Sequence, residues 1–179
     1  MEAPSGRVVK PEQPVHLLLR CWGKCTKVDT GSARVKTVQR EIIINAPAEK
    51  VWAALTTFAL YQEWNPFISA VTGKASVGER LRVKAKLPGL PEIAFGATVK
   101  SSLFPVELEW QAIFLKGVFE ASHSFTIERL AVGECRFLHV EQFSGILSAA
   151  VLFLLEGRFC EGYRLMNEAL KARVERREE

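Results

Sequence analysis

Two histidines and one glutamate fall among apolar residues at a spacing that could support acid–base chemistry. His139 and Glu141 are two residues apart. On a strand such residues share one face, with their Cα atoms about 7 Å apart. A His–Glu pair could act as general acid and base on an enolisable substrate, as a cyclase or dehydratase would require.

Strand parity places these three polar residues on an apolar face. His123 shares its parity with four apolar neighbours, namely Phe119, Ala121, Phe125 and Ile127. His139 and Glu141 likewise share the odd positions of their strand with Cys135, Phe137 and Phe143. A charge buried on such a face must be paired or neutralised, so each of the three side chains needs a polar partner.

Three roles are open for His123, His139 and Glu141. They could hydrogen-bond to one another, to Tyr163 or to a helix end, and so fix the last helix on the sheet. They could instead orient a bound ligand, or they could catalyse a reaction. The structural role is the commonest for such residues, so we assign no catalytic residue and keep these three as the candidates.

The elements that would position these residues follow in the order of an α+β domain. A β-rich run at 37–45 leads into a helix that starts near Pro47, and Pro66 ends the helical section. Period-2 alternation and turn residues then predict six strands, at 67–72, 79–86, 92–101, 106–113, 118–129 and 134–143. Alternation of polar with apolar residues is typical of an antiparallel sheet covered on one face.

The last segment, from Leu147 to Arg176, has apolar residues at helical spacing. At 1.5 Å per residue this helix would be roughly 45 Å long, enough to cross a concave sheet. Its start is almost uniformly apolar, which predicts that the helix is surrounded there.

Three segments carry a resemblance to a known family: Ile44–Trp52, Glu63–Phe67 and Glu141–Gly145. They resemble the SRPBCC proteins of the polyketide cyclase/dehydrase and START-like group, which share the helix-grip fold of the birch pollen allergen. The resemblance covers about residues 37–175. It implies a seven-stranded curved antiparallel sheet around a long C-terminal helix, with one or two short helices after the first strand. We expect this domain at 37–177, after a disordered basic extension at 1–36.

The fold implied by the resemblance does not select an activity, because the group includes lipid carriers, hormone receptors, aromatic cyclases and co-chaperones. An apolar concave face with few polar anchors favours binding of a hydrophobic small molecule such as a lipid, polyketide or isoprenoid. The residues expected to contact it are Trp64, Phe67, Phe95, Trp110, Phe119, His123, Phe125, His139, Glu141, Phe159 and Tyr163.

Two alternatives to a binding protein without established catalysis stay open. One is a cyclase/dehydratase-type enzyme that uses a His–Glu pair. The other is a protein-interaction module that uses an outward row of basic residues, Arg80, Arg82, Lys84 and Lys86. We interpret that row first as a solvated sheet face that discourages edge pairing, and second as a dock for an acidic membrane or an anionic partner.

Charge and composition argue against several other classes. The net charge of +4 arises within the first 36 residues, because the remainder carries 17 basic and 17 acidic side chains. We therefore expect no nucleic-acid partner. Cys21 and Cys25 lack a credible four-ligand zinc set, so we expect no metal, and no motif indicates a cofactor.

The sequence also lacks the features of a membrane-inserted or secreted chain. No apolar run approaches the ~20 residues of a membrane helix, and the start is a poor signal peptide. We expect a cytoplasmic protein, with organelle targeting by the extension as the alternative. Monomer and dimer are both compatible with the sequence.

Overall fold

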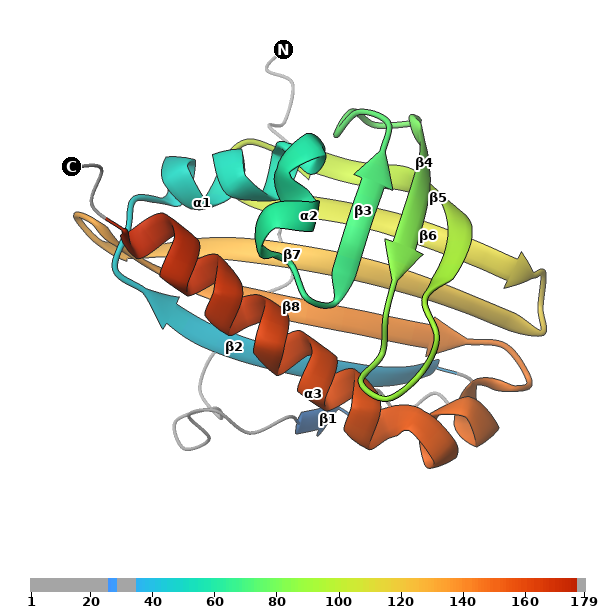
Figure 1. Ribbon diagram of the computed structural model, residues 1–179. Coiled ribbons are helices and arrows are strands. Elements are labelled where there is room, and N and C mark those ends of the chain that lie inside the picture. Colours follow the sequence, from blue (N-terminus) through green and yellow to red (C-terminus); the bar gives the residue numbers. More distant parts are fainter. Residues whose placement is uncertain (1–25, 29–34, 177–179) are drawn as a thin grey trace, which may run out of the picture.

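A computed structural model describes residues 26–28 and 35–176, and in it the strands form where alternation predicted them (Figure 1). The seven predicted strands are β2 to β8, and they build one curved antiparallel sheet. Their bounds are Val35–Ile44 (β2), Ile68–Thr72 (β3), Arg80–Ala85 (β4), Ile93–Leu103 (β5), Glu107–Leu115 (β6), Phe119–Ala131 (β7) and Glu134–Ser144 (β8). The helix-grip prediction is confirmed.

The strand order explains how the two ends of the domain meet. The order is β1-β2-β8-β7-β6-β5-β4-β3, so the first long strand lies beside the last one. A short strand β1, Thr26–Val28, pairs antiparallel with β2 and makes the sheet eight-stranded. This strand lies within the extension expected to be disordered, so the sheet begins earlier in the chain than expected. The prediction for 1–25 and 29–34 falls outside the described residues.

Short helices follow β2, as predicted. They are α1 (Ala48–Thr56), the 3₁₀ turn η1 (Phe58–Leu60) and α2 (Tyr61–Trp64). Asn65 has an extended backbone before Pro66 and ends α2. Its Oδ1 accepts hydrogen bonds from the backbone amides of Phe67 and Ile68, at 3.0 and 2.8 Å. This turn directs the chain into β3.

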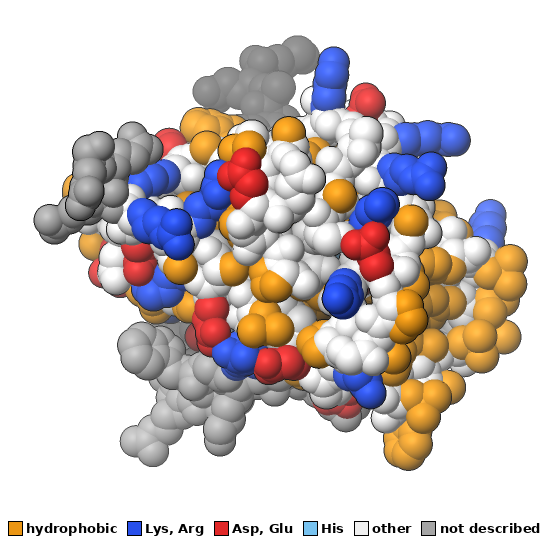
Figure 2. Space-filling view, in the orientation of Figure 1, with side chains coloured by type: hydrophobic (Ala, Val, Ile, Leu, Met, Phe, Trp, Pro, Cys, Tyr) orange, Lys and Arg blue, Asp and Glu red, His pale blue; other side chains and the backbone are white. Residues whose placement is uncertain are grey.

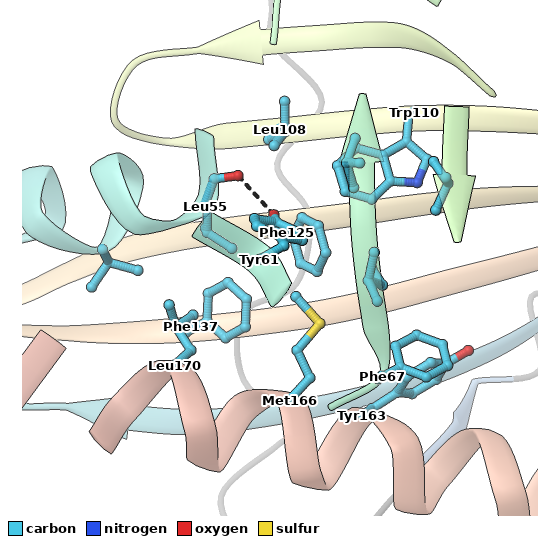
Figure 3. Packing of buried hydrophobic residues seen from close by; sticks show 14 of the residues in the cluster. Leu55, Tyr61, Phe67, Leu108, Trp110, Phe125, Phe137, Tyr163, Met166 and Leu170 are labelled. Carbon is cyan, nitrogen blue, oxygen red and sulfur yellow. Dashed lines mark hydrogen bonds between the residues drawn. The ribbon is translucent and has the colours of Figure 1, made fainter. Parts of the chain in front are cut away.

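The long helix α3, Ser148–Glu175, crosses the concave face of the sheet (Figure 1). The inner face of its second half is buried, and there Tyr163, Met166 and Leu170 are fully covered. In Figure 3 the Met166 side chain points from α3 toward Phe125 and Phe137 on the sheet. This half of α3 therefore forms the core of the domain together with the sheet.

The first half of α3 corrects a prediction. Its nearly uniform apolar sequence predicted a helix surrounded on all sides. In the structure Val151 and Leu155 face a cavity, whereas Phe153 and Leu154 are 88% and 73% exposed. The helix is covered on one side only, because the sheet and the β4–β5 loop reach just its inner face.

The basic row lies on the outer face of the sheet. Arg80, Arg82 and Lys84 are exposed and alternate with buried residues along β4. Lys84 pairs with Glu92 at 3.4 Å across the strand pair. None of the helices in the described part of the chain combines the length and hydropathy needed to cross a bilayer.

Candidate functional site

A cavity of about 320 Å³ lies between the concave face of the sheet and the first half of α3. Ligand pockets in proteins are typically about 300–1,000 Å³ and mostly apolar, and this cavity fits that description. Almost all of its lining side chains are predominantly apolar: Phe67, Ile68, Val83, Ala85, Leu87, Leu90, Pro91, Ile93, Phe95, Trp110, Phe114, Phe119, Ala121, Phe143, Val151, Leu155 and Phe159. Two ionisable side chains, His123 and Glu141, complete the wall.

His123 and Glu141 lie opposite each other on neighbouring strands, because β7 and β8 pair in that register. Burial alternates along both strands, and the odd-numbered residues of β8 are buried from Cys135 to Phe143. Both polar residues therefore face inward, as strand parity predicted. The Nδ1 atom of His123 is 3.6 Å from Oε1 of Glu141.

A continuous chain of polar contacts runs from this pair to α3. The Nε2 atoms of His123 and His139 are 2.5 Å apart, and Nδ1 of His139 lies 2.9 Å from Oδ1 of Asn167. At the other end, the phenol of Tyr163 donates a hydrogen bond to Oε2 of Glu141. Two residues of α3 are thus tied to the sheet through buried polar groups, as the structural interpretation of these residues expected.

One arrangement of hydrogens gives each contact of this chain a donor and an acceptor. In it Nδ1 of His139 donates a hydrogen bond to the Asn167 oxygen, and Nε2 of this neutral ring accepts a hydrogen bond from Nε2 of His123. His123 then has only its Nδ1 to present to Glu141. A favourable contact there requires one proton between the two groups, on the imidazole or on the carboxyl.

Burial sets the ionisation of the two groups that flank this pair. Complete burial, together with the neighbouring His123, lowers the pKa of His139 well below its ordinary value. Burial is the larger cause, and the carboxylate of Glu141 the smaller one, that raises the pKa of Tyr163 well above its ordinary value. At neutral pH His139 is therefore a neutral ring, and Tyr163 is a hydrogen-bond donor.

Phe67 covers the polar chain from the side of β3. Its ring lies 5.3 Å from that of Tyr163 and 6.2 Å from that of His123, measured between centroids. Figure 3 shows Phe67 and Tyr163 side by side above α3. A Cβ added at Gly162 would come within 2.7 Å of Phe67 Cδ2, so the missing side chain allows this close approach. The cavity floor is therefore a packed layer.

Of the eleven sequence-predicted residues, the structure brings seven to the cavity wall, places three behind it and leaves one away from it. The wall contains Phe67, Phe95, Trp110, Phe119, His123, Glu141 and Phe159. Phe125, His139 and Tyr163 are fully buried in the layer behind the wall. Trp64 packs edge-on against Tyr61, away from the cavity. His139 therefore contacts the wall residue His123 rather than the cavity itself.

Sequence reasoning missed Asn167, the α3 partner of His139. The signal was present, because Asn167 is four residues after Tyr163 and follows the buried Met166 on the same helical stripe. It also missed Leu90 and Pro91, which reach the cavity from the β4–β5 loop and carry no periodic pattern. Within residues 26–28 and 35–176, no group of three or more His, Cys, Asp or Glu side chains is arranged to hold a metal ion.

Residues 35–175 match the family model described as polyketide cyclase / dehydrase and lipid transport. The fold is similar to that of Zhui aromatase/cyclase from Streptomyces sp. R1128, with a TM-score of 0.65 and 16% identity, covering 80% of this chain and 95% of that one. The fold is also similar to that of a START superfamily protein from Mycobacterium smegmatis, with a TM-score of 0.61 and 19% identity, covering 78% of this chain and 97% of that one.

A third similar structure is truncated norcoclaurine synthase from Thalictrum flavum, with a TM-score of 0.60 and 12% identity, covering 87% of this chain and 99% of that one. No curated protein matches this chain. At these identities the solved structures establish the shared fold, whereas the family match covers most of the sequence.

Proposed function

Because this chain belongs to the polyketide cyclase / dehydrase and lipid transport family, we propose that it binds one hydrophobic small molecule between the sheet and the first half of α3. The observation that carries the proposal is the cavity of about 320 Å³, whose wall is almost entirely apolar. Removing an apolar ligand from water into such a cavity is favourable, by roughly 25 cal/mol per Å² of apolar surface buried.

The polar pair in the wall defines the chemistry of the ligand. His123 and Glu141 are the ionisable residues of the wall, at 5% and 8% exposure, and the wall residue Trp110 adds an indole N–H donor. A lone polar group of the ligand would be stabilised at this point, because the Glu141 carboxyl group can accept a hydrogen bond from it, or donate one when the carboxyl holds the proton. The ligand class is therefore a lipid, polyketide or isoprenoid with one hydroxyl or carbonyl group at its inner end.

The closeness of His123 and Glu141 in the cavity wall, with 3.6 Å between Nδ1 and Oε1, favours a second candidate, a cyclase/dehydratase-type enzyme. In this version one member of the pair takes a proton from the carbon next to a ligand carbonyl, and the other protonates the departing or receiving oxygen. The pair is His123 with Glu141 rather than His139 with Glu141, because His139 lies behind the wall. His139 acts as a positioning residue that fixes the tautomer of His123.

Native mass spectrometry of the purified chain tests the binding function. The expected spectrum contains a species heavier than the polypeptide by one apolar molecule, which organic extraction releases and identifies. A protein that carries no such molecule, and that also fails to bind fatty-acid and polyphenol probes after purification, would refute the proposal.

A further inference from the structure

Apolar side chains that face solvent gather at the end of the molecule where the cavity opens. Phe153 and Leu154 on α3 are 88% and 73% exposed, and Ile146 in the preceding loop is 79% exposed. Figure 2 shows hydrophobic side chains concentrated toward the right and lower right, over the start of α3 and the β6–β7 end of the sheet. We call this surface the apolar rim, and it comprises Ile113, Phe114, Leu115, Ile146, Phe153 and Leu154.

The two parts of the apolar rim are held side by side by backbone hydrogen bonds. The amide of Ile146 donates to the carbonyl of Gly117 at 3.3 Å, and that of Leu147 donates to Val118 at 3.0 Å. The loop before α3 is thereby fixed to the β6–β7 turn. Phe114 belongs to both surfaces, because it is 45% exposed and also lines the cavity. The rim is therefore continuous with the cavity wall.

Charge around the apolar rim favours an anionic partner surface. Residues 143–155 contain no charged side chain. Lys84 and Glu92 pair with each other on the outer face, which leaves three basic residues near the mouth, Lys86, Lys116 and Arg158, against two acidic ones, Glu120 and Glu156. Lys116 stands in the turn beside the rim. Basic residues beside exposed aromatic and aliphatic side chains are typical of protein surfaces that bind anionic lipid headgroups.

We propose that the apolar rim docks on the surface of a lipid bilayer that contains anionic lipids, with Phe153 and Leu154 inserted at the headgroup boundary. This inference rests on the proposed function, and it names the partner with which the bound hydrophobic molecule is exchanged. A helix that is apolar on all sides is usually covered on all sides. Here the inner side closes the cavity and the bilayer covers the outer side.

A bilayer fits the position of the rim better than a second copy of the chain does. Two copies joined through their rims would place the two cavity mouths against each other and close both of them. A bilayer instead receives the apolar side chains and opens the mouth toward the acyl chains. The hydrophobic molecule then passes between membrane and cavity without crossing water, which would otherwise oppose its transfer.

Flotation of the full chain with phosphatidylcholine vesicles, with and without phosphatidylserine, tests this docking. The test variant is F153E/L154E, and the matched control is V132E. Val132 is fully exposed in the β7–β8 turn, at the opposite end of the strands. We expect the wild type and V132E to float with the anionic vesicles. F153E/L154E should lose roughly ten-fold or more of its partitioning, because two inserted apolar side chains become charged.

Three results, two from flotation and one from sedimentation, would overturn the docking proposal. The flotation results are a wild type that stays unbound and an F153E/L154E variant that floats as well as the control. The third is a concentration-dependent dimer, seen by sedimentation, that F153E/L154E abolishes, because a second copy would then cover the rim.

A titration with a fluorescent fatty acid, without vesicles, separates this docking proposal from the proposed function. Phe153 and Leu154 do not line the cavity, so F153E/L154E should bind the probe within a few-fold of the wild type. A wild type that floats without binding the probe would refute the binding function alone. One that binds the probe without floating would refute the docking alone.

Discussion

The phenol of Tyr163, at the middle of α3, donates a hydrogen bond to Glu141 on the last strand of the sheet. This contact connects α3 to strand β8 of the sheet at the floor of the cavity. Because Glu141 also lines the cavity, one side chain both anchors α3 and presents a polar atom to a ligand. The structural and ligand-orienting interpretations of Glu141 are therefore compatible.

The Tyr163–Glu141 contact predicts an unequal cost for two similar substitutions. Tyr163→Phe leaves a buried carboxyl oxygen without its donor, which costs about 1–3 kcal/mol of unfolding free energy. Tyr61→Phe is the matched control, because the Tyr61 hydroxyl donates to the neutral carbonyl of Leu55 at 2.7 Å (Figure 3), and its loss costs about 1 kcal/mol. Urea denaturation measures both. Equal costs would argue against an ionised partner for Tyr163.

The buried His139 predicts a loss of stability in mild acid. Burial lowers the pKa of His139 in the native protein, whereas the unfolded chain takes up a proton near pH ~6.5. Below that pH the unfolded state binds more protons, so the unfolding free energy falls by up to about 1.4 kcal/mol per pH unit. Denaturation of His139→Gln between about pH 7 and about pH 5 should show a shallower slope than the wild type. Identical slopes would contradict this account.

Two glycines of α3 predict opposite responses to alanine. A Cβ at Gly157 would meet no heavy atom within 4 Å, so Gly157→Ala should stabilise the protein by about 1 kcal/mol through helix propensity. A Cβ at Gly162 would come within 2.7 Å of Phe67, and overpacking of about 1–3 kcal/mol should outweigh the same gain. Thermal and urea denaturation of the two variants measures the difference. Stabilisation of both would show that the Phe67 layer is loosely packed.

Substitution of Glu141 by Gln separates a binding protein from an acid–base catalyst. A binder should keep its affinity within a few-fold, because the amide still accepts the hydrogen bond of Tyr163. A catalyst should lose on the order of 10² to 10⁴ in rate. Deuterium incorporation next to the carbonyl of a bound β-keto ligand measures that rate by NMR. The control is Glu128→Gln, which alters an exposed carboxylate paired with Arg136.

Strand parity predicted the inward face of the sheet, because alternation along β7 is strict around His123. It could not separate the cavity wall from the layer behind it. His139 and Glu141 have the same parity, but α3 covers only His139 completely, and that depends on where the helix crosses. Phe125 is buried between Trp110 and Phe137, and Tyr163 is buried because it lies on the face of α3 that meets the sheet. Side-chain alternation reports a face of the sheet, whereas the position of a cavity depends on packing between distant elements.

The start of α3 shows a second limit of sequence reasoning. An apolar run indicates that side chains avoid water, but it does not say what covers them. Phe153 and Leu154 have the same apolar character as Leu155, yet only Leu155 faces the cavity. The prediction of a surrounded helix was wrong for that reason. The exposed side of the helix forms part of the apolar rim instead.

The most direct test of the central claim is a titration of the delipidated protein with a fluorescent fatty acid. Ala121 lines the cavity and is 6% exposed, so Ala121→Phe fills the space a ligand would occupy. Ala94→Phe is the control, because Ala94 is exposed on the outer face of β5. The account predicts binding to the wild type and the control, and a loss of roughly ten-fold or more in affinity for Ala121→Phe. Absence of binding to the wild type, or equal affinity for all three proteins, would contradict it.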